Sequence, residues 1–182
     1  MKVSLLLAPA LVALLIGGGT NPGVTPERGA PSARSLRLSV EAALEHGDVL
    51  AAMRTTSIAH GRAVRERSWE SLLAVGDEYC RIAARTEAPD AASQRARDAY
   101  QAALREARRA ESLDGVLRAA EGFAQLGDPG EVGLSLHIAR ELAGSDAEAI
   151  DDVRAAAGRL SDLLERARPD EAETIDDPGG TP

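Results

Sequence analysis

Few side chains in this sequence are capable of covalent or metal chemistry, and they are far apart. They are the only cysteine and the three histidines of the chain, namely Cys80, His46, His60 and His137. No histidine has a second histidine or a cysteine at the spacing of a zinc site, and we expect all three at the surface. The adjacent acids Asp151 and Asp152 lack the alternating oxygen ligands and the glycine of a calcium loop. The sequence therefore predicts neither a metal site nor a cofactor.

Catalytic motifs are equally scarce. No serine is flanked by glycines as in a nucleophile elbow, and no glycine-rich loop resembles a phosphate-binding loop. Cys80 has two interpretations, a small buried apolar residue between Tyr79 and Ile82, or an exposed thiol able to form a mixed disulfide. With one cysteine in the chain, an internal disulfide is excluded. We expect a protein that is not an enzyme.

Composition favours an all-α domain. Apolar residues make up 44% of the 182 residues, but aromatic residues only 2%. The core must therefore consist of Ala, Leu, Val and Ile, which suit close packing of helices better than sheets. The formal net charge of −8 argues against nucleic acid as a partner, because proteins that bind it present basic surfaces.

The N-terminal segment, residues 1–19, has the pattern of a secretory signal. Lys2 precedes an apolar run at residues 3–16, and three glycines at 17–19 offer small residues for cleavage. Cleavage would give an exported, periplasmic or extracellular protein of a bacterial cell envelope. The alternative is an inner-membrane protein in which uncleaved residues 3–16 form the tether.

The remaining chain divides into a helical domain between two segments without apolar periodicity. Residues 20–34 are rich in Pro and Gly and are predicted to form a flexible linker, and residues 168–182 an acidic disordered tail. Residues 35–167 have helical periodicity. The first expected helix ends before Gly47. The others are expected at residues 49–67, 69–85, 91–110, 113–126, 132–143 and 147–167. Ser145 and Glu148 have the spacing of a capping box for the last of them.

Two stretches of the helical domain share one pattern of large, small and aromatic residues. The first consists of Leu72, Val75, Gly76 and Tyr79, followed by Ala96, Tyr100 and Ala103. The second consists of Val116, Ala119, Ala120 and Phe123, followed by Val132, Leu136 and Ala139. A weaker copy begins at Leu36, with Ala43 and Thr56 at the aromatic positions. An insertion at residues 85–93, which contains Pro89, separates the helices of the first full copy.

This pattern resembles the tetratricopeptide repeat, in which small residues let paired helices cross closely and large residues fill the gaps. The resemblance implies a short right-handed α-solenoid of about three antiparallel helix pairs, with residues 147–167 as a C-terminal capping helix. The alternative is an antiparallel helical bundle without internal repeats, which would have a similar composition.

In the tetratricopeptide family, the inner faces of the first helices line a concave groove. Matching those positions implies a partner-binding surface of Arg37, Glu41, Leu73, Asp77, Cys80, Arg81, Leu117 and Glu121, with Arg34, Glu45 and Gln125 beside them. Leucines mixed with both signs of charge suit a short peptide, so we expect a non-catalytic protein–protein adaptor or scaffold. Two alternatives remain open: the charges are merely a solvated helix face, or the protein is a self-associating, membrane-anchored structural bundle.

Overall fold

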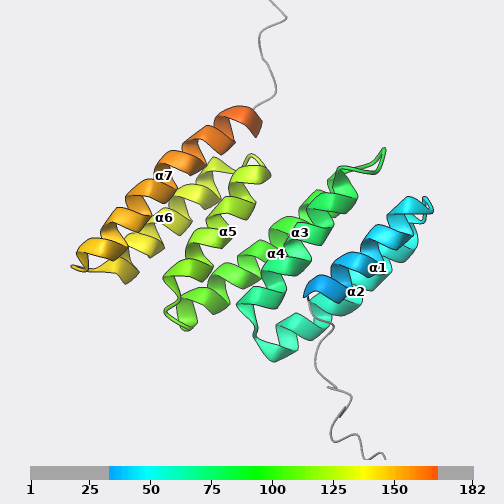
Figure 1. Cartoon of the computed structure of the whole chain (residues 1–182), viewed down its shortest axis with the longest axis horizontal. Helices are drawn as coiled ribbons and strands as arrows, with labels where there is room; N and C mark the ends of the chain where they lie inside the picture. Colours follow the sequence, from blue (N-terminus) through cyan, green and yellow to red (C-terminus); the bar gives the residue numbers. More distant parts are fainter. Residues whose placement is uncertain (1–32, 168–182) are drawn as a thin grey trace, which may run out of the picture.

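The structure is a computed structural model that describes residues 33–167, and these residues form seven α-helices and no strand. The helices are α1 (Ala33–Glu45), α2 (Val49–Glu66), α3 (Trp69–Ala83), α4 (Asp90–Arg109), α5 (Leu113–Gln125), α6 (Pro129–Ala143) and α7 (Ala147–Ala167). The all-α prediction is confirmed (Figure 1). The expected signal at residues 1–19, the expected tail at 168–182 and all but the last two residues of the expected linker at 20–34 lie outside the described residues.

Most helix boundaries differ from the expected ones by a few residues. Helix α1 begins at Ala33, inside the expected linker, and α3 ends at Ala83 rather than at residue 85. Helix α6 begins at Pro129 rather than at residue 132, because a proline in the first turn gives up no intrahelical hydrogen bond. The insertion at 85–93 is only partly a loop, since α4 begins at Asp90, directly after Pro89.

Four turns between helices share one local design. Each has a residue with positive φ, namely Gly47, Arg67, Glu111 and Gly127, followed by an aspartate or a serine at the start of the next helix. The left-handed residue reverses the chain, and the next backbone N–H bonds back to a carbonyl of the preceding helix, as Ser68 N does to Ala63 O. The Ser68 and Ser112 hydroxyls then accept from backbone N–H groups of α3 and α5. These turns force consecutive helices to run antiparallel.

The expected capping box at Ser145 is wrong by one residue. Helix α7 begins at Ala147, so Asp146 occupies the position before it. The Asp146 carboxylate accepts hydrogen bonds from the backbone nitrogens of Glu148 and Ala149 at 3.0 and 3.2 Å. A carboxylate at a helix start also interacts favourably with the helix dipole, which the serine hydroxyl would not do as strongly.

The helices pack in chain order, and each odd-numbered helix also touches the next odd-numbered helix. Each helix contacts its successor, and α1 contacts α3, α3 contacts α5, and α5 contacts α7. Figure 1 shows the hairpin of α1 and α2 at one end of the array and α6 with α7 at the other. One apolar cluster runs through this array, from Leu36 and Val40 in α1 to Leu160 in α7. None of the described helices is long and apolar enough to cross a membrane.

Tyr100 occupies the tightest part of the core. A Cβ added at Gly76 of α3 would lie 2.4 Å from the Tyr100 ring, and one added at Gly122 of α5 would lie 2.6 Å from it. The ring of this α4 residue therefore lies between the backbones of α3 and α5. It also meets Phe123 edge to face, with ring centroids 5.9 Å apart. The sequence pattern indicated Gly76 as a small position, but it pointed to Ala120 rather than to Gly122.

Candidate binding groove

Two pockets adjoin on the face formed by α1, α3 and α5, and we call this face the groove. The pocket between α1 and α3 has a volume of about 320 Å³ and is lined by Ala33, Arg34, Arg37, Ala74, Asp77, Glu78 and Arg81. The pocket between α3 and α5 has a volume of about 160 Å³ and is lined by Leu73, Asp77, Arg118, Glu121, Gly122 and Gln125. Asp77 lines both, so the two pockets form a continuous track across three helices.

Most of the charged residues expected at the partner-binding surface lie along this track. Asp77 lines both pockets, Arg37 and Arg81 line the α1–α3 pocket, and Glu121 lines the α3–α5 pocket. Glu41 lies beside them, because its carboxylate is 3.6 Å from the Arg81 guanidinium. The structure therefore brings together residues from α1, α3 and α5 that are far apart in the sequence.

The two leucines expected at the groove surface are placed differently. Leu73 is only 2% exposed and belongs to the core, although it touches the edge of the α3–α5 pocket. Leu117 is half-buried and packs against the same core. The reason is that α3 contacts both α4 and α5, so neighbouring helices cover much of its apolar surface. The groove surface is consequently more polar than the sequence pattern indicated.

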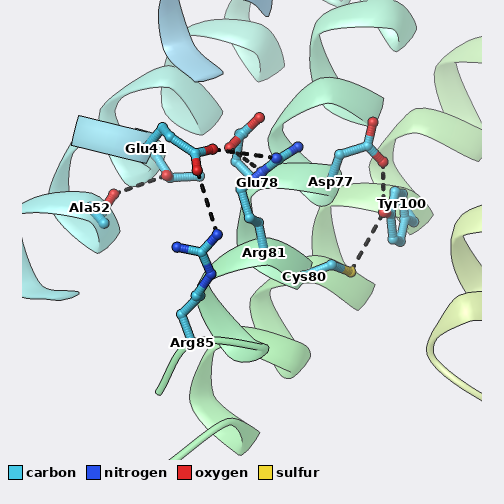
Figure 2. Close-up of polar contacts among 9 residues, drawn as sticks. Glu41, Ala52, Asp77, Glu78, Cys80, Arg81, Arg85 and Tyr100 are labelled. Atoms are coloured by element: carbon cyan, nitrogen blue, oxygen red, sulfur yellow. Dashed lines mark hydrogen bonds and ion pairs between the residues drawn. The ribbon is translucent and has the colours of Figure 1, made fainter. Parts of the chain in front are cut away.

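A network of partly exposed ion pairs joins α1 to α3 beside the groove. The Arg81 guanidinium lies 3.6 Å from the Glu41 carboxylate and 3.1 Å from that of Glu78, and Arg85 reaches Glu41 at 3.5 Å. Figure 2 shows Glu41 of α1 facing Arg81 and Glu78 of α3, with Arg85 approaching from the turn after α3. Pairs that remain partly exposed are worth less than about 1 kcal/mol each. Their main effect is to hold the guanidinium of Arg81 in one orientation.

Glu78 is the groove residue that the sequence pattern missed. Its side chain is buried, with 3% of the residue exposed, and burial raises its pKa even though Arg81 and Arg37 lower it. The only local signal was its position three residues before Arg81, which allows an ion pair within a helix. That spacing does not reveal burial, because burial depends on the packing of α1 and α2 against α3.

The raised pKa of Glu78 predicts how stability depends on pH. The folded state holds this proton more tightly than the unfolded state, so its contribution is full at acidic pH and is lost as pH rises through the folded pKa. Glu78→Gln removes this titratable group. The free energy of unfolding of the variant minus that of the unmodified protein should therefore increase from about pH 4 to about pH 7. Urea unfolding at both values measures this, with the exposed Glu165→Gln as the matched control. A constant difference between variant and unmodified protein would contradict the expectation.

Tyr100, Asp77 and Cys80 form a second polar cluster beside the network. The Tyr100 hydroxyl donates to the Asp77 carboxylate at 2.8 Å, and the Cys80 sulfur lies 3.6 Å from the same hydroxyl (Figure 2). Burial raises the pKa of both Tyr100 and Cys80 above their ordinary values. Cys80 is half-buried, so it is neither the fully buried apolar residue nor the exposed thiol that its sequence position allowed. Its raised pKa disfavours the reactive thiolate. The cluster orients the Asp77 carboxylate and does not activate a nucleophile.

The histidines lie apart from this face. His46, directly after α1, and His137 in α6 are exposed, as expected, and contact the Ala42 carbonyl and the Glu141 carboxylate, respectively. The expectation is wrong for His60, which is half-buried against the Tyr79 ring and has a pKa lowered by burial. Among residues 33–167, no group of three or more His, Cys, Asp and Glu side chains is arranged to hold a metal ion.

Comparisons with known proteins give no further assignment for this chain. No protein-family model, no curated protein and no solved structure matches it. The groove offers oriented carboxylates and guanidinium groups over two adjoining pockets, a chemistry suited to binding.

Proposed function

We propose that this chain is a non-catalytic adaptor or scaffold that binds a peptide segment of a partner protein along the groove. The observation that carries the proposal is that Asp77 lines two adjoining pockets, which extends one polar track across α1, α3 and α5. A compact ligand fills a single pocket, whereas an extended peptide contacts a series of them. The track therefore favours a peptide.

The proposed architecture is a short right-handed α-solenoid of tetratricopeptide-like pairs, formed by α1–α2, α3–α4 and α5–α6, with α7 as the cap. Contacts of α1 with α3, α3 with α5 and α5 with α7 support it, because solenoid units touch mainly their neighbours. Small residues at the closest crossings, Gly76 and Gly122, also support it. The first helices of such pairs share one face, and that face is the groove.

The charges along the groove indicate the chemistry of the peptide. Arg34 and Arg37 line the α1–α3 pocket, whereas Glu121 lines the α3–α5 pocket beside Arg118 and lies 3.6 Å from the Arg159 guanidinium of α7. Asp77 lies between them, with its carboxylate held by Tyr100. A peptide with an acidic side chain over α1 would complement this order, and a basic side chain over α5 would replace Arg159 beside Glu121. This complementarity would contribute mainly to specificity.

The proposed place of action is the bacterial cell envelope, after export directed by residues 1–19. This part of the proposal rests on the sequence pattern of the N-terminal segment alone. It is consistent with a binding role, since an exported adaptor needs neither a cofactor nor a nucleotide.

Selection of peptides from a random displayed library on the full chain tests the proposed function. Selected peptides should bind Arg37→Glu/Glu121→Arg at least about tenfold more weakly, because two charges of the track are reversed. The matched control is Arg105→Glu/Glu165→Arg, which reverses the same residue types at exposed positions of α4 and α7. Equal binding to both variants, or no selected peptide, would contradict the proposal.

A further inference from the structure

Two opposite charges line the α3–α5 pocket of the groove without pairing with each other. Asp77 of α3 and Arg118 of α5 are both exposed, and both line this pocket of about 160 Å³. Among residues 33–167, neither of them forms an ion pair. Asp77 bonds to the Tyr100 hydroxyl instead, and the Arg118 guanidinium lies over the Trp69 ring. The pocket therefore keeps a carboxylate and a guanidinium apart.

The Arg118 guanidinium is held by an aromatic ring that is itself fixed. Its central carbon lies 5.7 Å from the centroid of the Trp69 ring, within the range of a cation–π contact. Trp69 packs against the core, and a Cβ added at Gly115 of α5 would lie 3.0 Å from its ring. Gly115 thus lets the ring lie close to the α5 backbone, and Arg118 follows three residues later on the same face of α5. The ring gives the guanidinium a position that does not depend on Asp77.

The Asp77 carboxylate is fixed from the other helix. Its Oδ1 accepts from the Tyr100 hydroxyl at 2.8 Å, and the Tyr100 ring is wedged between Gly76 and Gly122. Figure 2 shows only one of the two Asp77 oxygens engaged with Tyr100. A carboxylate has about four acceptor positions, so Asp77 retains the capacity to accept from a ligand. The pocket therefore presents a fixed acceptor on α3 and a fixed donor on α5.

This pair selects a neutral group that both donates and accepts hydrogen bonds. A carboxylate would bond to Arg118 but meet the like charge of Asp77, and a cation would bond to Asp77 but meet Arg118. A primary carboxamide has two N–H donors and a carbonyl acceptor at one end, and it carries no charge. Glu121 also lines the pocket but has a partner outside it, since Arg159 of α7 lies 3.6 Å away.

We propose that the α3–α5 pocket binds the side-chain carboxamide of a glutamine or asparagine in the peptide. This inference rests on the proposed function and adds a second determinant to the acidic side chain over α1. The Asp77 carboxylate accepts from the amide nitrogen, and the Arg118 guanidinium donates to the amide oxygen. Trp69 and Tyr100 are positioning residues, because they hold these two groups and do not line the pocket.

Peptides selected on the full chain from a random displayed library provide the first measurement. We expect glutamine or asparagine to be enriched at one position. Replacing that residue by its isosteric acid, or by an apolar residue of similar size, should weaken binding at least about tenfold, because the pocket's polar groups would then lack their partners. Trp69 is the only tryptophan of the chain, so its fluorescence reports whether a peptide reaches the neighbouring guanidinium.

A double-mutant cycle provides the second measurement. Arg118→Met should weaken binding of the carboxamide peptide, but it should have little effect on the peptide with the apolar replacement. Arg105→Met, at an exposed arginine of α4, is the matched control and should leave both affinities unchanged. Circular dichroism verifies that both variants remain helical.

The outcomes separate this inference from the proposed function. Selected peptides without enriched glutamine or asparagine, whose binding is still weakened by Arg37→Glu/Glu121→Arg, would overturn the carboxamide site and leave the peptide-binding groove standing. So would equal losses for the two peptides on Arg118→Met. Failure to select any peptide would overturn the proposed function and the carboxamide site together.

Discussion

Gly76→Ala and Gly122→Ala should each destabilise the protein by about 2–3 kcal/mol, the cost of overpacking a core that cannot relax. At Gly76, the new methyl group would lie 2.4 Å from the Tyr100 ring, and at Gly122 it would lie 2.6 Å from it. The ring cannot move away from one glycine without approaching the other. Alanine is otherwise the better helix former, by about 1 kcal/mol, so the expected sign is the reverse of the intrinsic preference.

Two other glycines provide the matched control. Gly133 in α6 and Gly158 in α7 have no atom within 4 Å of an added Cβ. Alanine at either position should stabilise the protein by up to about 1 kcal/mol. Urea unfolding measures the stability of all four variants. When Tyr100 is replaced by leucine, Gly76→Ala should lower the free energy of unfolding by less, because the ring that the methyl group meets is gone. Four alanine variants of equal effect would show that Tyr100 does not lie between the two backbones.

Leu73→Arg should leave no stable folded state at room temperature. Leu73 is 2% exposed, so the substitution removes a buried side chain and places a guanidinium among apolar neighbours, at a cost of more than about 4 kcal/mol. Loss of the cooperative thermal transition in circular dichroism measures this. Leu134→Arg is the control, because Leu134 is 50% exposed and should change stability by less than about 0.5 kcal/mol.

The same variant separates two roles for Leu73. A folded Leu73→Arg protein that has lost peptide binding would place this leucine at the groove surface, as the repeat pattern implied. An unfolded one places it in the core. Leu117→Arg should have an intermediate cost, since Leu117 is half-buried and the long arginine stem can lie along the core while its charge reaches water.

Features that depend on short-range physics were predictable from the sequence. The sequence predicts the turns at Gly47 and Gly127 correctly, because glycine adopts positive φ at little cost and the aspartate that follows can start the next helix. The helices themselves follow from apolar periodicity, and the small position at Gly76 from the repeat pattern. The cap of α7 was misplaced by one residue because serine and aspartate are both good caps, and only the helix start distinguishes them.

Features that depend on the angle between helices were not predictable. The repeat pattern assigns a face to Leu73 from its position in one helix, whereas its burial depends on how closely α4 and α5 approach α3. Glu78 was missed for the same reason, since charged residues are rarely buried and nothing local marks this one. The charged residues of the groove were easier to place, because a solvated position tolerates small errors in the helix angle.

The position of Tyr100 has a consequence for how the two halves of the groove accommodate a ligand. By filling the space between Gly76 and Gly122, the ring sets the spacing of α3 and α5, and that half is preorganised. Helices α1 and α3 are joined differently, by the ion pair of Arg81 with Glu41, whose side chains are both partly exposed. In the proposed peptide complex, the α3–α5 half would then keep its shape, and adjustment to ligand size would fall to the partly exposed ion pair between α1 and α3.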